Sequence, residues 1–237
     1  MLPEALVPHR VAVYAAPPPG SPWWERGSEW LGRCAFRCSE WPQPLVPQVD
    51  AATLSALTAD PRRYGWHATL KAPWRLAPQA GVAALRAGLA AICQAHSAIE
   101  LPDLRVTRLG SFLALCPADP PAALGALADD CVRRLQALAA PLSEAELARR
   151  RRQPLTPEED ALLLAWGYPW VLHRFRFHFS LTGPLRGVPD ETVAAVQRAA
   201  EAHFAGLPPW RLDRLSVFIE PTPGADFALL EHLELSS

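Results

Sequence analysis

The sequence lacks the features that mark several common classes of protein. No apolar run approaches the roughly 20 residues that a membrane helix needs. The first residues lack the basic start and long apolar stretch of a signal peptide. The sequence also contains no glycine-rich phosphate loop of the GxGxxG or GxxxxGK type and no GxSxG nucleophile elbow. We therefore expect a soluble, cytoplasmic protein that makes no contact with a membrane.

The sequence also has almost no net charge and no closely spaced cysteine pair. The formal net charge is -1, so no bulk basic field exists to attract long nucleic acid. The one dense basic run, residues 149–152, is typical of a solvated helix end, and a phosphate-facing role is the alternative interpretation. The five cysteines form no CxxC pair, which favours reduced thiols that fill small apolar spaces.

Helical and strand periodicities alternate along the chain. Apolar residues at helical spacing or helix start signals predict helices at residues 23–31, 53–60, 82–92, 124–138, 143–150, 156–166 and 193–204. Alternating patterns predict strands at residues 10–16, 65–71, 104–109, 112–116, 173–182, 212–220 and 227–235, the last at an edge. Strand pairs with helices between them indicate an α+β fold rather than a regular parallel array.

One short motif occurs twice, and it is the most informative feature of the sequence. HATLKAP at residues 67–73 aligns without gaps with HFSLTGP at residues 178–184, and both read H-x-[ST]-L-x-[AG]-P. A single H-x-T would carry almost no information. Two copies that share leucine and proline at the same offsets are much harder to obtain by chance.

Strand geometry predicts which side chains of the two copies share a face. Residues two apart point to the same side of a strand, roughly 6.5–7 Å apart. His67, Thr69 and Lys71 would therefore share one face of the first copy. In the second copy, the residues expected on one face are Arg174, Arg176, His178, Ser180 and Thr182. Each strand then has an apolar side for packing and a polar side for a cleft.

If the two strands face one another, His67 and His178 can act as an acid–base pair on a phosphodiester. Imidazole titrates near neutral pH, so one ring can take a proton from water while the other protonates the leaving oxygen. The hydroxyls of Thr69 and Ser180 can donate hydrogen bonds to phosphoryl oxygens, and Lys71, Arg174 or Arg176 can add positive charge. Two histidines without a carboxylate make a poor metal-ligand set, so we expect no metal and no cofactor.

With these motifs, the chain resembles the 2H phosphoesterase superfamily, which is named for two H-x-[ST] motifs. The segments RRYGWHATLKAPWRL, LARRRRQPL, WGYPWV and RFHFSLTGPL are similar to a subgroup associated with phosphonate (carbon–phosphorus lyase) gene clusters. The resemblance extends from about Arg10 to the C-terminus.

The resemblance implies a single bilobal domain over residues 1–237. Two lobes related by a pseudo-twofold axis would line a central cleft with antiparallel sheets, and the helices would lie outside. It also implies metal-independent hydrolysis of a cyclic or linear phosphodiester. The residues that match the family motif are His67, Thr69, His178 and Ser180.

The expected activity is hydrolysis of a small cyclic phosphate, such as a ribosyl cyclic phosphate in phosphonate breakdown. One alternative is an enzyme that processes RNA ends carrying 2′,3′-cyclic phosphates. Another is a protein that binds a phosphorylated metabolite without converting it. The sequence leaves open the exact substrate, which histidine is the acid, and the oligomeric state.

Overall fold

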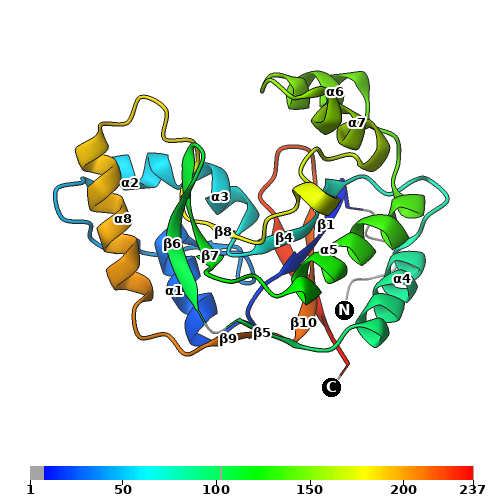
Figure 1. Cartoon of the computed structure of the whole chain (residues 1–237), viewed down its shortest axis with the longest axis horizontal. Coiled ribbons are helices and arrows are strands. Elements are labelled where there is room, and N and C mark those ends of the chain that lie inside the picture. Colours follow the sequence, from blue (N-terminus) through cyan, green and yellow to red (C-terminus); the bar gives the residue numbers. More distant parts are fainter. Residues whose placement is uncertain (1–7, 102, 237) are drawn as a thin grey trace.

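An antiparallel sheet of seven strands runs through the computed structural model, which describes residues 8–101 and 103–236 (Figure 1). Its strand order is β11 (Ala228–Glu234), β10 (Arg214–Glu220), β1 (Arg10–Ala15), β4 (Ala68–Trp74), β8 (Phe179–Ser180), β7 (Phe112–Pro117) and β6 (Leu104–Leu109). Two separate pairs are β2 (Arg33–Cys34) with β3 (Ser39–Glu40), and β5 (Ile99–Leu101) with β9 (Trp210–Leu212). The antiparallel α+β class is confirmed, and pairing of β4 with β8 joins the strands of the two expected lobes into one sheet.

Eight α-helices accompany the sheet in the described part of the chain. They are α1 (Pro22–Leu31), α2 (Ala51–Leu57), α3 (Ala59–Tyr64), α4 (Val82–Ala95), α5 (Ala122–Leu135), α6 (Glu144–Arg151), α7 (Pro157–Trp166) and α8 (Asp190–Phe204). Figure 1 shows α1 and α8 on one side of the molecule, α4 and α5 on the other, and α6 and α7 at one end. Both α6 and α7 begin with a complete capping box, which satisfies backbone N–H groups of the first turn.

One face of the sheet is apolar and packs against the helices. Val13, Leu115 and Phe179 lie on this face and belong to one continuous core, which also includes residues of α4, α5 and α8. Burial of this surface removes apolar area from water at roughly 25 cal/mol per Å². The opposite face of the central strands carries Thr69 and Tyr14, which pair across β4 and β1, and the Tyr14 ring stacks there on His67.

The strand predicted at residues 173–182 is much shorter in the structure. Leu172–Arg174 forms a 3-10 helix, and only β8 is paired as a strand. His173 hydrogen-bonds to Glu158 and Arg174 forms an ion pair with Glu159, which draws the start of the segment toward α7 instead of along the sheet. The prediction was wrong there because alternation alone does not show whether a neighbouring strand is available.

All five cysteines are free, and Cys34, Cys93 and Cys131 are buried, as expected for small core residues. Cys38 is exposed, contrary to that expectation, because it occupies a turn with φ +51° between β2 and β3. Among the described residues, no helix combines the length and apolar character required to cross a bilayer.

Candidate active site

The register of β4 against β8 brings the two motifs together. Ala68 pairs with Phe179, so the neighbouring positions place His67 opposite Ser180 and Thr69 opposite His178. Side chains opposite one another in such a pair have Cβ atoms roughly 4.5–5.5 Å apart, and diagonal ones roughly 7–8 Å. Extending the single Ala68–Phe179 pair by one residue in each direction puts two imidazoles and two hydroxyls at the corners of a small cross-strand square on one face of the sheet.

Aromatic packing on the opposite face fixes this square from behind. Trp66, which precedes His67, stacks on Phe179, which follows His178, with ring centroids 4.9 Å apart. The same indole also stacks on Phe204 of α8 at 5.2 Å. These rings are mostly or fully buried, so the backbone beneath the two histidines is held by well-packed side chains.

A hydrogen bond to the backbone orients His67. Its Nδ1 lies 2.9 Å from the carbonyl oxygen of Gly65, and because a carbonyl only accepts, Nδ1 carries the proton. Gly65 adopts φ +79°, a conformation that favours glycine, and this turn aims its carbonyl at the ring. The other nitrogen, Nε2, is left as an acceptor and lies 3.2 Å from the Thr69 hydroxyl.

His178 is oriented in the same way. Its Nδ1 lies 2.8 Å from the carbonyl oxygen of Arg176, two residues earlier, as Gly65 is two residues before His67. The two copies thus share a local hydrogen bond as well as a sequence pattern. In both rings Nε2 is the nitrogen that does not contact a backbone carbonyl, and a phosphodiester would have to replace the Thr69 hydroxyl at Nε2 of His67 for proton transfer there.

Both rings are partly buried, which favours their neutral forms. Burial and, to a smaller extent, positive charge on His178 lower the pKa of His67 to about 4, and the Gly65 hydrogen bond opposes this shift. Burial also lowers the pKa of His178, opposed by its bond to Arg176. Positive charge on His178 therefore disfavours protonation of His67.

Lys71 does not join the histidines. Tyr14 and Val13 are adjacent in β1, but their partners in β4, Thr69 and Lys71, are two positions apart, so β4 contains a bulge. The extra residue reverses the alternation, and Lys71 points to the same side as Val13. The strand-parity prediction is wrong for this residue because parity holds only where pairing is regular.

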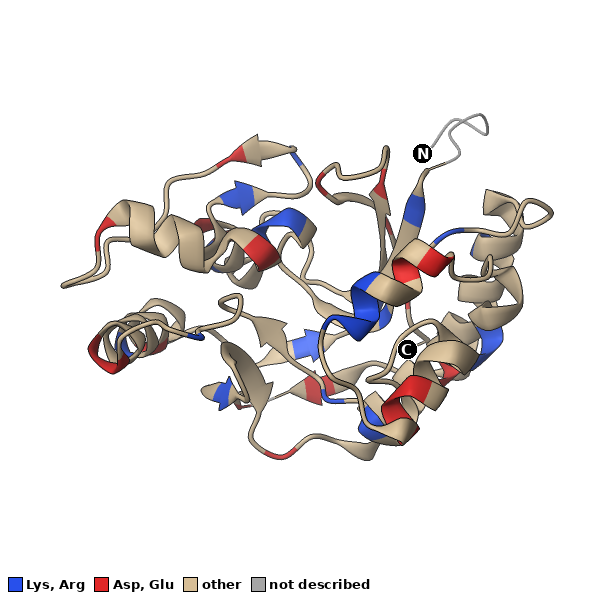
Figure 2. Ribbon diagram, turned by 90° about the horizontal axis from the view of Figure 1, so that it is seen from above, with Lys and Arg blue, Asp and Glu red and all other residues tan. Residues whose placement is uncertain are grey.

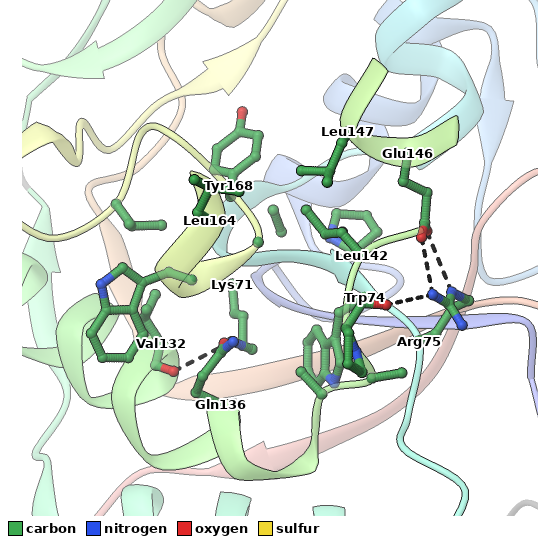
Figure 3. Close-up of a pocket in the computed structure, with 18 residues that line it drawn as sticks. Lys71, Trp74, Arg75, Val132, Gln136, Leu142, Glu146, Leu147, Leu164 and Tyr168 are labelled. Atoms are coloured by element: carbon green, nitrogen blue, oxygen red, sulfur yellow. Dashed lines mark hydrogen bonds and ion pairs between the residues drawn. The ribbon is translucent and has the colours of Figure 1, made fainter. Parts of the chain in front are cut away.

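The Lys71 amine lies instead beside a hollow of about 360 Å³ near α5, α6 and α7 (Figure 3). It donates hydrogen bonds to the carbonyl oxygen of Val132 and to Oε1 of Gln136, at 3.3 and 3.0 Å. Burial lowers its pKa to about 8. Tyr168 lines this hollow, whereas neither His67 nor His178 does.

The remaining polar residues of the second copy divide between surface and core. Arg176 is exposed, and its carbonyl rather than its side chain contacts His178. Arg174 pairs with Glu159 of α7. Thr182 is buried and accepts a hydrogen bond from the backbone N–H of Leu113 at 3.0 Å. Of the three, Arg176 alone remains a candidate for contact with a ligand.

Sequence reasoning missed the aromatic residues around His67. The Tyr14 ring stacks on the imidazole with centroids 3.7 Å apart, and Tyr64 lies at 6.2 Å. A signal existed for Tyr64, because one of the segments that carry the resemblance includes it.

Over residues 69–228 the chain matches a family described as "Protein of unknown function (DUF1045)". The chain belongs to this family. Two curated relatives of this DUF1045 chain, from Janthinobacterium sp. (strain Marseille) and Laribacter hongkongensis (strain HLHK9), are both named "Ribose 1,5-bisphosphate phosphokinase PhnN". They are 41% and 40% identical to it over 96% and 93% of its length. The matches cover 51% and 50% of the relatives, so the DUF1045 chain spans about half of their length.

Among solved structures, the DUF1045 chain is similar to E. coli LigT complexed with 3'-AMP and with NADP+. The TM-scores are 0.45 and 0.43, with 14% and 15% sequence identity, over 97% of this chain and 99% of each LigT chain. At this level of similarity, conclusions about chemistry rest on the residues of the DUF1045 chain itself.

Proposed function

We propose that this protein hydrolyses a phosphodiester with His67 and His178 as its acid–base pair and without a metal ion. The observation that carries the proposal is the cross-strand square formed by the two histidines with Thr69 and Ser180. No group of three potential metal-ligating side chains occurs within residues 8–101 and 103–236, and the proposed chemistry requires none.

The proposed reaction uses the Nε2 atoms of the two imidazoles, with the Thr69 hydroxyl turned from His67 toward the substrate. One imidazole removes a proton from a water molecule as the water oxygen forms a bond to phosphorus. The other, protonated imidazole donates its proton to the ester oxygen as that P–O bond breaks. Hydroxyls from Thr69 and Ser180 donate hydrogen bonds to the non-bridging oxygens, where negative charge increases. The products are a phosphomonoester and an alcohol, which remain one molecule if the substrate is cyclic.

We further propose a small cyclic phosphate, such as a ribosyl one formed in phosphonate breakdown, as the substrate. The name PhnN denotes a product of phosphonate gene clusters, which fits this context. The kinase activity in that name belongs to proteins about twice as long as the matching region. Because this chain contains no GxxxxGK loop, we attribute phosphodiester hydrolysis, not phosphoryl transfer from a nucleotide, to the matching region.

Purified protein should hydrolyse a cyclic phosphodiester in the presence of a chelator, and His67→Ala and His178→Ala should each reduce kcat about 10²–10⁴-fold. His173→Ala is the matched control, because His173 lies on the same segment as His178 but is exposed and paired with Glu158. Thermal unfolding of each variant separates lost chemistry from lost folding.

Wild-type turnover in both histidine variants would contradict the mechanism, and loss of activity with the chelator would contradict its independence from metal. A substrate panel distinguishes the possible substrates. Faster turnover of a short RNA ending in a 2′,3′-cyclic phosphate than of a cyclic mononucleotide or ribosyl phosphate would favour RNA end processing.

A further inference from the structure

Lys71 is the only lysine of the chain, although the sequence contains 23 lysine and arginine residues. Figure 2 shows the basic positions spread over helices and strands across the molecule. The Lys71 side chain, by contrast, belongs to the interior and is only 3% exposed. Arginine stays charged in proteins, whereas a buried lysine amine can lose its proton and act as a nucleophile. The single lysine therefore offers a chemistry that none of the arginines offers.

The contacts of the Lys71 amine provide hydrogen-bond acceptors but no opposite charge. The amine donates to the carbonyl oxygen of Val132 and to Oε1 of Gln136, and no carboxylate in the described part of the chain pairs with it. Two acceptors match the two N–H groups of a neutral amine and leave its lone pair unused. Burial lowers the pKa of this amine to about 8, so about one-tenth of it is uncharged at neutral pH.

The hollow that Lys71 lines is large enough for a small molecule. Its volume of about 360 Å³ falls within the range of roughly 300–1,000 Å³ that is typical of small-ligand pockets. Much of its wall is apolar or aromatic, including Trp74, Leu142, Leu147, Leu164, Trp166 and Tyr168. The other charged residues of the wall, Arg75 and Glu146, pair with each other at 3.0 Å, on the opposite side of the view from Lys71 in Figure 3. A ligand in this hollow would therefore meet one reactive amine on a largely apolar wall.

We propose that Lys71 binds a small aldehyde or ketone with an apolar body in this hollow, as a Schiff base. The nitrogen lone pair forms a bond to the carbonyl carbon, and a proton moves from nitrogen to the carbonyl oxygen to give a carbinolamine. The carbinolamine then loses its hydroxyl group and the remaining N–H proton as water, which leaves a C=N bond. No oxidant or reductant is consumed. Neither His67 nor His178 lines the hollow, so this site is separate from the proposed hydrolytic one.

The test treats the protein with benzaldehyde and sodium cyanoborohydride at pH 7 and locates the reduced adduct by peptide mass mapping. The matched reference is Arg149→Lys, which introduces a second lysine at an exposed position of α6. Within this one variant, Lys71 should be labelled about 10-fold faster than the introduced lysine or more, because a larger fraction of its amine is uncharged. Equal or slower labelling of Lys71, in protein shown to be folded by circular dichroism, overturns the proposal.

A second measurement tests whether the hollow holds the aldehyde before it reacts. The rate of labelling at Lys71 should saturate as the benzaldehyde concentration rises. Benzyl alcohol, which has the same ring but no carbonyl group, should slow labelling at Lys71 and leave the introduced lysine unaffected. A Lys71 rate that rises linearly with benzaldehyde and does not respond to benzyl alcohol would overturn binding in the hollow.

Discussion

Two hydroxyl residues of the second motif, Ser180 and Thr182, have different environments although they lie two positions apart. Ser180 is opposite His67 and partly exposed on the polar face. Thr182 is almost fully buried, and its hydroxyl accepts from the backbone N–H of Leu113. Ser180 is placed to contact a ligand, whereas Thr182 satisfies a buried donor. Substitution of Ser180 should therefore affect catalysis, and substitution of Thr182 should affect stability.

We expect Ser180→Ala to reduce kcat about 10²-fold, because it removes a hydrogen bond to the developing negative charge, and to leave unfolding unchanged. Thr182→Val should leave kcat within a few-fold but lower the free energy of unfolding by about 1–3 kcal/mol, since the Leu113 N–H loses its partner. Steady-state kinetics and urea unfolding of both variants test this contrast. The reverse pattern would show that the two roles are assigned wrongly.

Among the elements, α1 packs closely against the residue that precedes the first motif. A Cβ atom at Gly27 would lie 2.0 Å from the ring of Trp66, the indole next to His67 in sequence. A residue without a side chain is therefore required for α1 to pack against this indole.

Gly27→Ala should destabilise the protein by about 1–3 kcal/mol, because the added methyl group displaces a buried indole. Gly125→Ala in α5 is the matched control: nothing lies within 4 Å of its Cβ position, and alanine favours a helix by up to about 1 kcal/mol. Thermal unfolding should therefore shift in opposite directions. A stabilised Gly27→Ala protein would show that Trp66 can move without cost.

Predictability from sequence also depends on the element. The β6–β7 hairpin around Gly110 and the amphipathic helices follow from local periodicity, and the structure confirms them. The bulge in β4 and the short length of β8 do not, since both depend on how a strand pairs with its neighbours. Lys71 was misplaced for this reason.

At the scale of the whole molecule, the candidate site combines segments that are far apart in sequence. The meeting of His67 and His178 could be predicted because the motif is repeated. The position of Tyr14 could not, because this residue belongs to no repeat and its approach to His67 depends on the tertiary fold. Sequence reasoning thus identified the proposed reacting groups better than the residues that surround them.

Buried histidines also make the stability of the whole molecule depend on pH. Burial lowers the pKa of His67 and of His232 to about 4 in the folded protein, against roughly 6.5 in an unfolded chain. As the pH falls from 6.5 toward 4, the unfolded chain therefore binds protons that the folded protein does not. Their contribution to stability is present in full above pH 6.5 and is lost through this window.

We expect the urea concentration at the unfolding midpoint to be lower at pH 4.5 than at pH 7. The decrease should be smaller in His232→Asn, because this variant lacks one of the two histidines. His232 lies in β11 and hydrogen-bonds to Ser216, so this variant should retain turnover. Identical pH dependence in the variant and the wild type would show that His232 titrates normally in the folded protein.

The backbone carbonyls behind the two imidazoles have a consequence for proton balance. In a serine protease, a carboxylate behind the histidine supplies negative charge; here Gly65 and Arg176 supply only neutral acceptors. No carboxylate contacts either ring within the described residues, so no nearby negative charge stabilises a protonated imidazole in the free protein. An arriving phosphodiester brings the missing negative charge itself, and the complex should contain one more proton than its two separated components. Binding of the phosphodiester thereby favours protonation of one of the two neutral imidazoles, and this imidazole can then act as the general acid in its hydrolysis.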